Sequence, residues 1–474
     1  MININYVSGT SYTHYYFSFA FCFVDHDILT VCEMDRYIRI AKAYKGIFIL
    51  LFITFCLILP LCFHKNPNSL YFTNFGSSIS EDSLRKENSR RLKHAEVHFK
   101  KMRDEMNSNK HFNTNKGRID VAIVVITTSR NRHKIDEYEP KYLTQTLMKL
   151  YELRDVFMNN ATPAASSFNE STRLKTESDE EDNNLKWSPN RIHSLRAQIS
   201  HNVPISVCNV DHDIASYYEA TLMESVAPFV NRFSKHHRST LHVLEKEKQD
   251  YVFCLNHSLQ LNPRYVMLVE DDAFPLDNLF PVLFHTIHSQ LDAHIARGEL
   301  HEGPRKEIAF VKFFHPERLQ SYFRPDLYRP LQLFAMSVTL SSSVVLIYSV
   351  ICKYRELSIH ITWALWTFYF IALLVAIGHP NVAQLRSIFE PYLYSCRPAP
   401  SCCTQAMLFP TTTAVSVINY MQSKECSNGY GKDSILDDLQ RDLGLQALFV
   451  EPNVFQHIGM YSTLRKLLVD PLNV

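Results

Sequence analysis

The chain has 474 residues, enough for two or three domains or for one large domain with insertions. Its 49 basic and 48 acidic side chains nearly balance, which gives no support for nucleic-acid binding. It has only 11 glycines and lacks a glycine-rich phosphate loop, which argues against a P-loop or dinucleotide-binding protein.

The first 45 residues precede a long apolar segment and are predicted to be cytosolic. Residues 15–24 are apolar and aromatic, but this stretch is too short to cross a bilayer and lacks the basic start of a signal peptide. Met34 is a more conventional starting residue. One interpretation is that residues 1–33 are an upstream extension of the reading frame.

Residues 46–63 form an uncharged stretch of 18 residues, long enough to span a hydrocarbon core about 30 Å thick. Four basic residues precede it: Arg36, Arg39, Lys42 and Lys45. By the positive-inside rule this asymmetry places the N-terminus in the cytosol and the following chain in the lumen. A cleaved signal peptide would need a small-residue cleavage site, so a transmembrane signal anchor is predicted.

After this span, residues 64–116 are polar and charged, as expected of a lumenal stem, and residues 80–106 within it can form a helix. Residues 117–330 then alternate apolar strands with amphipathic helices, which predicts the first part of an α/β domain with a mainly parallel sheet. Residues 159–189 interrupt this pattern with a polar, acidic segment predicted to be a disordered insertion. The strands are expected at 119–128, 203–210, 265–269 and 308–314, and the helices at 142–158, 243–261 and 280–296.

The strand at 265–269 is followed directly by Glu270, Asp271 and Asp272. Three carboxylates cannot sit inside a core without partners, so they must lie at the exposed carboxyl end of the strand. Open α/β sheets bind their ligands at that edge. Adjacent carboxylates repel one another unless a hard divalent cation offsets the repulsion. A solvated acidic turn is the alternative for such a triplet taken alone.

Two further apolar segments, residues 331–352 and 359–378, flank a charged link at 353–358. Neither contains Asp, Glu, Lys or Arg up to residue 377, which predicts a transmembrane hairpin with its basic tip in the cytosol. Residues 379–474 return to soluble patterning, with a helix opening at Gly431 and a strand at 448–450. Because this segment is too small to bury its own core, it is expected to complete the sheet begun before the hairpin.

Several motifs together resemble the post-GPI-attachment GalNAc transferases of the Golgi, from about residue 40 to the end. The resemblance implies a GT-A glycosyltransferase domain interrupted by a membrane hairpin, with three spans in all. It also implies UDP-GalNAc as donor, a divalent cation expected to be Mn²⁺, and inverting transfer to the first mannose of the GPI glycan of GPI-anchored proteins. The motifs are Glu245 to Cys254, Val269 to Asp272, His315 to Leu319, Cys402 to Pro410, Gly431 to Asp433, and Glu451 to Asn453 with His457 to Gly459.

The resemblance also implies site residues. Glu270, Asp271 and Asp272 correspond to the acidic motif that binds metal and UDP, with Asp272 as the expected direct ligand. His457 is expected to join Asp272 and Glu270 around the cation, since neutral imidazole is a common metal ligand. A lone histidine is otherwise more often structural.

Donor-binding positions correspond to Thr128, Thr404, Gln405 and Lys432, with Gln405 standing where the family has proline. Asp433 corresponds to the general base, because an inverting transferase needs one carboxylate, apart from the metal ligands, to take the acceptor's proton. The alternatives in the same predicted helix are Asp437 and Asp438.

The resemblance implies a disulfide between Cys208 and Cys254. The adjacent Cys402 and Cys403 either form a bridge or remain two free thiols, and Cys396 and Cys426 are a further candidate pair. Two rival functions remain open: transfer of another UDP-sugar to N-glycans, and a non-enzymatic three-span adaptor. A transporter would place charged groups inside its spans, whereas these three segments have no acidic residue, Lys or Arg.

Overall fold

The computed structural model describes residues 45–72 apart from 65 and 67, then 81–107, 118–129, 140–161, 202–234, 241–293, 306–323, 327–352, 359–388, 391–462 and 467–468. The predictions for residues 1–33, for the hairpin tip at 353–358 and for most of the 159–189 insertion concern residues outside these ranges. The first three residues of that insertion belong to helix α4, Tyr142–Ala161.

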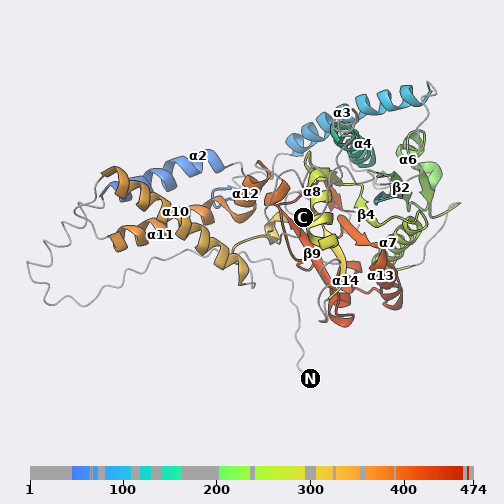
Figure 1. The fold of residues 1–474 in the computed structure, drawn as a ribbon. Coiled ribbons are helices and arrows are strands. Elements are labelled where there is room, and N and C mark those ends of the chain that lie inside the picture. The colour runs from blue at the N-terminus through green and yellow to red at the C-terminus, as the bar shows by residue number, and fades with distance from the viewer. Residues whose placement is uncertain are drawn as a thin grey trace, which may run out of the picture.

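Three helices are long and apolar enough to cross a membrane: Lys45–Phe63, Tyr328–Val350 and Ile359–Ile377. The second and third belong to α10, Tyr328–Cys352, and α11, Ile359–Ile377. Figure 1 shows the three helices as a bundle beside the α/β domain. Hydroxyl pairs link them, Ser341 with Thr367 at 2.8 Å and Thr54 with Tyr369 at 3.0 Å. The chain is therefore a multi-pass membrane protein.

The domain is built on one eight-stranded sheet, in the order β3-β2-β1-β4-β8-β6-β9-β7. Six strands share one direction, whereas β8 runs antiparallel to β4 and β6, and β7 runs antiparallel to β9. This confirms the predicted mainly parallel sheet of the GT-A type. The strands are β1 Val121–Thr127, β2 Ile205–Asn209, β3 Phe229–Asn231, β4 Tyr265–Glu270, β6 Ile308–Lys312, β7 Ser395–Pro398, β8 Ala406–Pro410 and β9 Gln446–Glu451.

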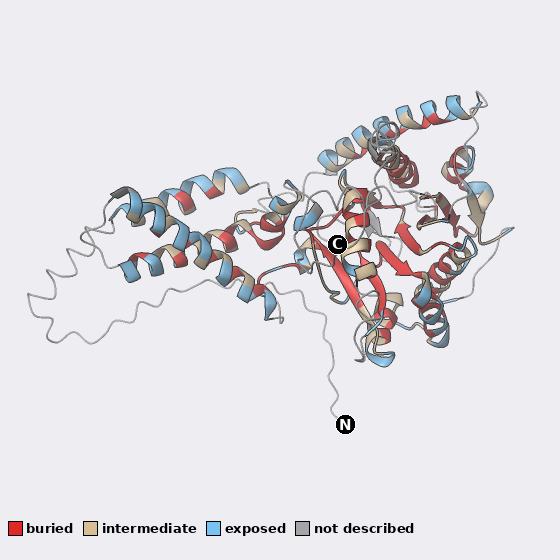
Figure 2. Ribbon diagram, viewed as in Figure 1, coloured by how far each residue is buried: buried red, intermediate tan, exposed pale blue. Residues whose placement is uncertain are grey.

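The membrane hairpin interrupts this sheet. Strands β7, β8 and β9 follow α11 in the chain, yet β8 is hydrogen-bonded between β4 and β6. The prediction that the last segment completes the sheet is therefore confirmed. Strands β8 and β9 of this segment are almost wholly buried, like the red central strands in Figure 2, which explains their continuous apolar runs.

Helices cover both faces of the sheet. One core cluster joins it to α3 Glu81–Asn107, α4 and α8 Leu279–Thr286, and the other joins it to α7 Val243–Leu259, α13 Thr411–Ser423 and α14 Lys432–Asp442. Helix α3 lies in the segment expected to be a stem, but Ala95, Phe99 and Met102 pack into the first cluster. This helix is therefore an integral layer of the domain.

Two boundaries differ from the sequence prediction. The helix expected at 280–296 is α8 followed by a π-helical turn, η4 Ile287–Asp292. Helix α10 begins at Tyr328, three residues before the predicted apolar segment, because Arg329 is buried against Glu451 of the domain. The remaining elements are η1 Thr54–Ile58, α2 Leu59–Phe63, η3 Ile214–Ser216, α6 Tyr218–Met223, β5 Ala273–Pro275, η5 Glu317–Leu319, α12 His379–Gln384, η6 Leu385–Ile388, η7 Pro391–Leu393, β10 Phe455–His457, β11 Tyr461–Ser462 and β12 Leu467–Leu468.

Candidate functional site

The acidic triplet lies at the carboxyl end of β4, as predicted, but Asp271 and Asp272 are buried there and not exposed as expected, because partners from other segments surround them. Its three side chains have different partners. Glu270 accepts hydrogen bonds at Oε1 from the Thr404 hydroxyl at 2.9 Å and from the Lys432 ammonium at 3.1 Å. Thr404 precedes β8 and Lys432 begins α14, so the second part of the domain supplies both contacts.

Lys432 is surrounded by acids. Burial alone would lower the pKa of its ammonium, but the charges of Glu270, Glu247 and Asp433 outweigh burial and raise that pKa. Glu247 lies in α7 and was not among the predicted site residues. Burial, together with the charges of Glu270 and Asp433, raises the pKa of the Glu247 carboxyl despite the opposing effect of Lys432. This edge of the sheet therefore concentrates negative charge.

Asp271 is directed into the protein. Its Oδ2 accepts a hydrogen bond from the Thr127 hydroxyl at 2.8 Å, and the Thr127 oxygen is 2.5 Å from the Tyr217 hydroxyl. The Asp271 carbonyl accepts from the Thr146 hydroxyl at 2.7 Å. These contacts hold the triplet against β1 and α4, so in this arrangement Asp271 positions its two neighbours.

Asp272 meets His457, as the resemblance implies. The Asp272 Oδ2 and His457 Nε2 atoms are 3.4 Å apart, and both side chains are largely buried. The Ile458 amide donates to the Asp272 carbonyl at 2.9 Å, and His457 lies in β10, which pairs with β5 just after the triplet. Two segments about 185 residues apart are thus fixed to each other by backbone hydrogen bonds.

Gly459 lies beside this pair and, because it has no side chain, keeps the adjacent space open. A Cβ atom at that position would lie 2.5 Å from Asp272 Oδ2 and 3.0 Å from His457 Nε2. Any larger residue would displace these two side chains. One carboxylate and one imidazole, converging on space kept clear by a glycine, fit the first ligands of a divalent cation such as Mn²⁺.

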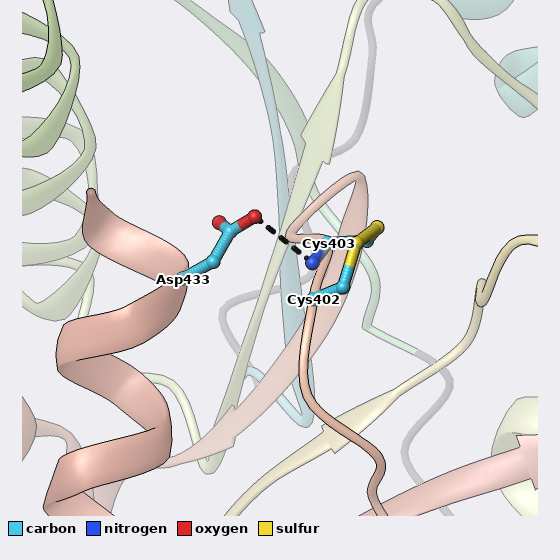
Figure 3. Close-up of side chains that lie close together, drawn as sticks. All are labelled: Cys402, Cys403 and Asp433. Carbon is cyan, nitrogen blue, oxygen red and sulfur yellow. Dashed lines mark hydrogen bonds between the residues drawn. A yellow bond between two sulfur atoms is a disulfide. The ribbon is translucent and has the colours of Figure 1, made fainter. Parts of the chain in front are cut away.

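Asp433 lies in the first turn of α14, and Figure 3 shows it facing the Cys402–Cys403 turn. Its Oδ2 accepts a hydrogen bond from the Cys403 amide at 3.0 Å. Its buried Oδ1 has no hydrogen-bond partner among the described residues. One oxygen is thus fixed while the other is left to receive a proton or a ligand hydroxyl.

The turn facing Asp433 is built from adjacent cysteines that form a disulfide, which resolves the alternative of two free thiols. Both residues have positive φ, 87° for Cys402 and 77° for Cys403. The Lys312 ammonium donates to the carbonyls of Pro400 at 3.1 Å and Cys402 at 2.8 Å. Burial lowers the pKa of this lysine.

Asp437 lies one helical turn beyond Asp433. Its Oδ1 is buried without a hydrogen-bond partner in the described part of the chain, and burial raises the pKa of its carboxyl. It also lines a hollow with Lys306, Gln440 and Arg441. Asp438 differs, because it bonds Tyr430 and Arg441 at the surface.

The other donor-binding candidates have distinct surroundings. The Thr128 hydroxyl donates to Asp211 Oδ2 at 3.3 Å, and the Ser129 amide donates to the same oxygen at 2.8 Å. Asp211 follows β2, and its buried carboxylate shapes the loop after β1; the sequence analysis missed it. The buried Oε1 of Gln405 accepts no hydrogen bond from the described residues, whereas its main-chain carbonyl accepts one from the Glu270 amide.

The Cys208–Cys254 disulfide is present and ties β2 to α7. Cys396 and Cys426 are free thiols in this structure, so the candidate bridge between them is not formed. Burial raises the pKa of each of these two thiols to about 11.

The structure thus brings together Glu270, Thr404 and Lys432, and separately Asp272 with His457. Glu247 escaped notice because it lies in a charged run, Glu245 to Asp250, that is typical of a solvated helix face. The available signal was its place on the helix: Glu247 is four residues before the buried Tyr251, so the two side chains lie on the same face of α7.

A comparison with known families assigns the architecture to a group. The profile described as GPI-N-acetylgalactosamine transferase PGAP4 matches residues 178–456, which include the acidic triplet, the hairpin, the cysteine turn and β10 up to Gln456. The matched segment covers more than half of the chain. The chain belongs to the GPI-N-acetylgalactosamine transferase PGAP4 family of glycosyltransferases.

Proposed function

We propose that this protein transfers N-acetylgalactosamine from UDP-GalNAc to the first mannose of the GPI glycan on GPI-anchored proteins, with inversion and with a divalent cation, in the Golgi. The observation that carries the proposal is the family match over a domain whose acidic edge also has a separate, partly unpartnered carboxylate. An adaptor would have no use for this arrangement of buried acids.

Asp272 and His457 would hold the cation, with Glu270 at the same edge. When bound, the cation would neutralise charge that develops on the UDP leaving group. The residues proposed to contact the donor are Thr128, Thr404, Gln405 and Lys432, while Asp271, which the resemblance also placed in the UDP-binding motif, would position Glu270 and Asp272. Lys432 adds a fixed positive charge that favours the diphosphate.

Asp433 would act as the general base. The Cys403 amide fixes one carboxylate oxygen, which orients the other toward an acceptor hydroxyl. That oxygen would take the proton as the hydroxyl attacks the anomeric carbon and the bond to UDP breaks. The acceptor is expected to be membrane-tethered, which agrees with a domain attached to three spans. The apolar pattern and the basic residues before the first span support a lumenal domain.

The test uses the full-length protein in liposomes that also contain a GPI-anchored protein. UDP-GalNAc, UDP-GlcNAc, UDP-galactose and UDP-glucose are supplied in turn, with Mn²⁺ or with a chelator, and the released glycan is analysed by mass spectrometry. We expect one N-acetylhexosamine on the first mannose, only from UDP-GalNAc and only with the cation. Addition to N-glycans, or no transfer from any donor, would contradict the proposal.

The Asp272→Ala variant should abolish this transfer while the protein still folds. Asp277→Ala is the matched control, because that carboxylate lies five residues further on and its side chain is 88% exposed. Full activity of Asp272→Ala with Mn²⁺ would show that the cation is held elsewhere.

A further inference from the structure

A group of large apolar side chains is exposed at the junction between the helix bundle and the α/β domain. These side chains lie outside the three spans, in the short segments that connect the spans to the sheet. We refer to them as the collar. Its members and their exposed fractions are Leu70 71%, Phe323 73%, Leu327 82%, Leu385 55%, Ile388 73% and Leu393 49%.

Three members of the collar lie in segments next to the domain-side ends of the spans. The Leu70 amide donates to the carbonyl of Ala376, one residue before the end of α11, at 2.8 Å. Phe323 follows Tyr322, whose ring packs edge-on against His379, with centroids 4.8 Å apart, at the start of α12. Leu327 directly precedes α10. Three separate chain segments thus present apolar side chains at the level where the spans end.

The other collar residues lie a short distance further along. Leu385 and Ile388 belong to η6, which follows the six-residue α12, and Leu393 ends η7. A six-residue helix rises about 9 Å. The polar zone of one leaflet is roughly 5–7 Å deep, and helices that lie in the interface insert about 5–10 Å. The rise of α12 is thus an upper limit of about 9 Å on its contribution to the separation from the third span, which is comparable to the depth over which interfacial helices insert.

Among the described residues, three arginines near the collar have partners in the protein. Arg329, two residues after Leu327, is buried and donates to Glu451 at 3.3 Å. Arg397, four residues after Leu393, pairs with the same carboxylate at 3.2 Å. Arg386, between Leu385 and Ile388, donates to the Ser395 hydroxyl. Charges turned inward and apolar groups turned outward are the reverse of a water-facing surface.

Elsewhere on the domain, exposed large apolar side chains are scattered. Val97 lies in α3, Tyr218 in α6, Val415 in α13 and Leu443 after α14, each on a different element. Single exposed residues of this kind are normal in soluble proteins. The collar differs because its residues gather in the segments that adjoin the ends of the membrane spans.

We propose that the collar inserts into the leaflet on the domain side of the membrane, so that the α/β domain rests directly on the lipid headgroups. The occupant of this surface is lipid, because the collar continues the lipid-facing surface of the spans without a polar gap at Leu327 and α10. Tyr392 and Tyr328, both exposed beside it, are typical of residues at a membrane–water interface.

The test is photocrosslinking of the full-length protein in phosphatidylcholine liposomes that contain a traceable lipid. Benzoyl-phenylalanine replaces Phe323 or Ile388, one at a time, and lipid adducts are counted by mass spectrometry. Tyr218, 74% exposed on α6, is the matched negative position. Leu346, 64% exposed within α10, is the matched position inside a span.

We expect the lipid adduct at Phe323 and Ile388 to exceed that at Tyr218 at least tenfold and to approach that at Leu346. Adducts at the Tyr218 level, while Leu346 reacts, would overturn the proposal. So would adducts to a second copy of the chain or to another protein. Because the readout is lipid adduct and not transfer, its outcome is independent of the proposed function.

Discussion

Two charge clusters in this molecule, one buried and one half-buried, have opposite proportions of acids and bases. In the neck between bundle and domain, the fully buried carboxylate of Glu451 lies within 3.3 Å of Arg329 and 3.2 Å of Arg397. At the site edge the proportions are reversed, since Lys432 stands among Glu270, Glu247 and Asp433.

His379 adds no positive charge to the neck. Burial, together with the charges of Arg329, Arg397 and Arg386, lowers the pKa of this histidine to about 3, so it is neutral at physiological pH. Two guanidinium groups therefore face one carboxylate in the neck, which leaves this cluster with an excess of positive charge. The site edge has an excess of acids, which is costly when buried unless protons or an added cation offset it. The first cluster serves the architecture, and the second is suited to a ligand.

The largest effect should come from a substitution at the site edge, and it should lower turnover without lowering stability. Asp433→Asn removes a proton acceptor while keeping the shape, so we expect kcat to fall about 10²–10⁴-fold with little change in thermal stability. Initial rates in liposomes, with donor affinity measured separately, check this.

Asp438→Asn is the matched control for that variant, because the Asp438 carboxylate belongs to the same helix but bonds Tyr430 and Arg441. If Asp437→Asn loses turnover and Asp433→Asn does not, the base is one turn further along α14.

Disrupting the charge cluster in the neck should lower the stability of the folded protein. Glu451→Gln leaves two buried guanidinium groups without a carboxylate, and breaking such a pair typically lowers the free energy of unfolding by about 3–5 kcal/mol. Thermal unfolding of the purified protein measures the loss, and Glu425→Gln, an exposed glutamate after α13, is the control. If Glu451→Gln were as stable as the parent protein, the neck cluster would not have the structural role that distinguishes it from the site edge.

A smaller effect should come from removing the lysine at the site edge. Lys432→Met removes the partner of Glu270, and the loss of a charged hydrogen bond costs about 1–3 kcal/mol. Mn²⁺ should stabilise this variant more than it stabilises the parent protein, because the acids at the edge then lack the positive charge of Lys432. Lys424→Met, at a half-exposed pair with Asp442, is the comparison. If Mn²⁺ stabilised Lys432→Met and Lys424→Met equally, the idea that unbalanced acids at the site edge attract a cation would be wrong.

The smallest effect should be a pH dependence of stability near the triplet. Burial raises the pKa of Glu219 from 4.5 to about 7, although Thr144 donates two hydrogen bonds to it. The folded state therefore keeps a proton that the unfolded chain releases. The resulting stability is fully present below pH 4.5 and is lost as pH rises through 7. We expect the melting temperature to fall by a few degrees between pH 5 and 7.5, and Glu219→Gln to reduce that fall.

Apolar runs made much of the architecture predictable. The strand at 265–270, the hairpin and the completion of the sheet by the last segment each follow from uninterrupted apolar stretches or from what a short segment can bury. The acidic triplet was placed at its edge by the cost of burying carboxylates alone. The meeting of Asp272 with His457 came from resemblance, because nothing local links residues so far apart in sequence.

Long-range charge pairs were not predictable. Arg329 and Glu451 are separated by 122 positions, and each alone suggests a solvated residue. Asp211 is likewise buried, and Glu247 half-buried, among residues from distant strands and helices. The left-handed φ values of Cys402 and Cys403 also had no sequence signal, since such values favour glycine or asparagine.

The position of the hairpin within the sheet also governs the order of events during synthesis. Strand β4 is complete at residue 270, but its neighbour β8 begins at residue 406, after both hairpin helices. At typical translation rates that interval lasts roughly ten to thirty seconds. During it the half-sheet has an unpaired edge strand, which readily pairs with other chains. Biogenesis of this protein therefore depends on protecting that edge until the membrane helices are inserted.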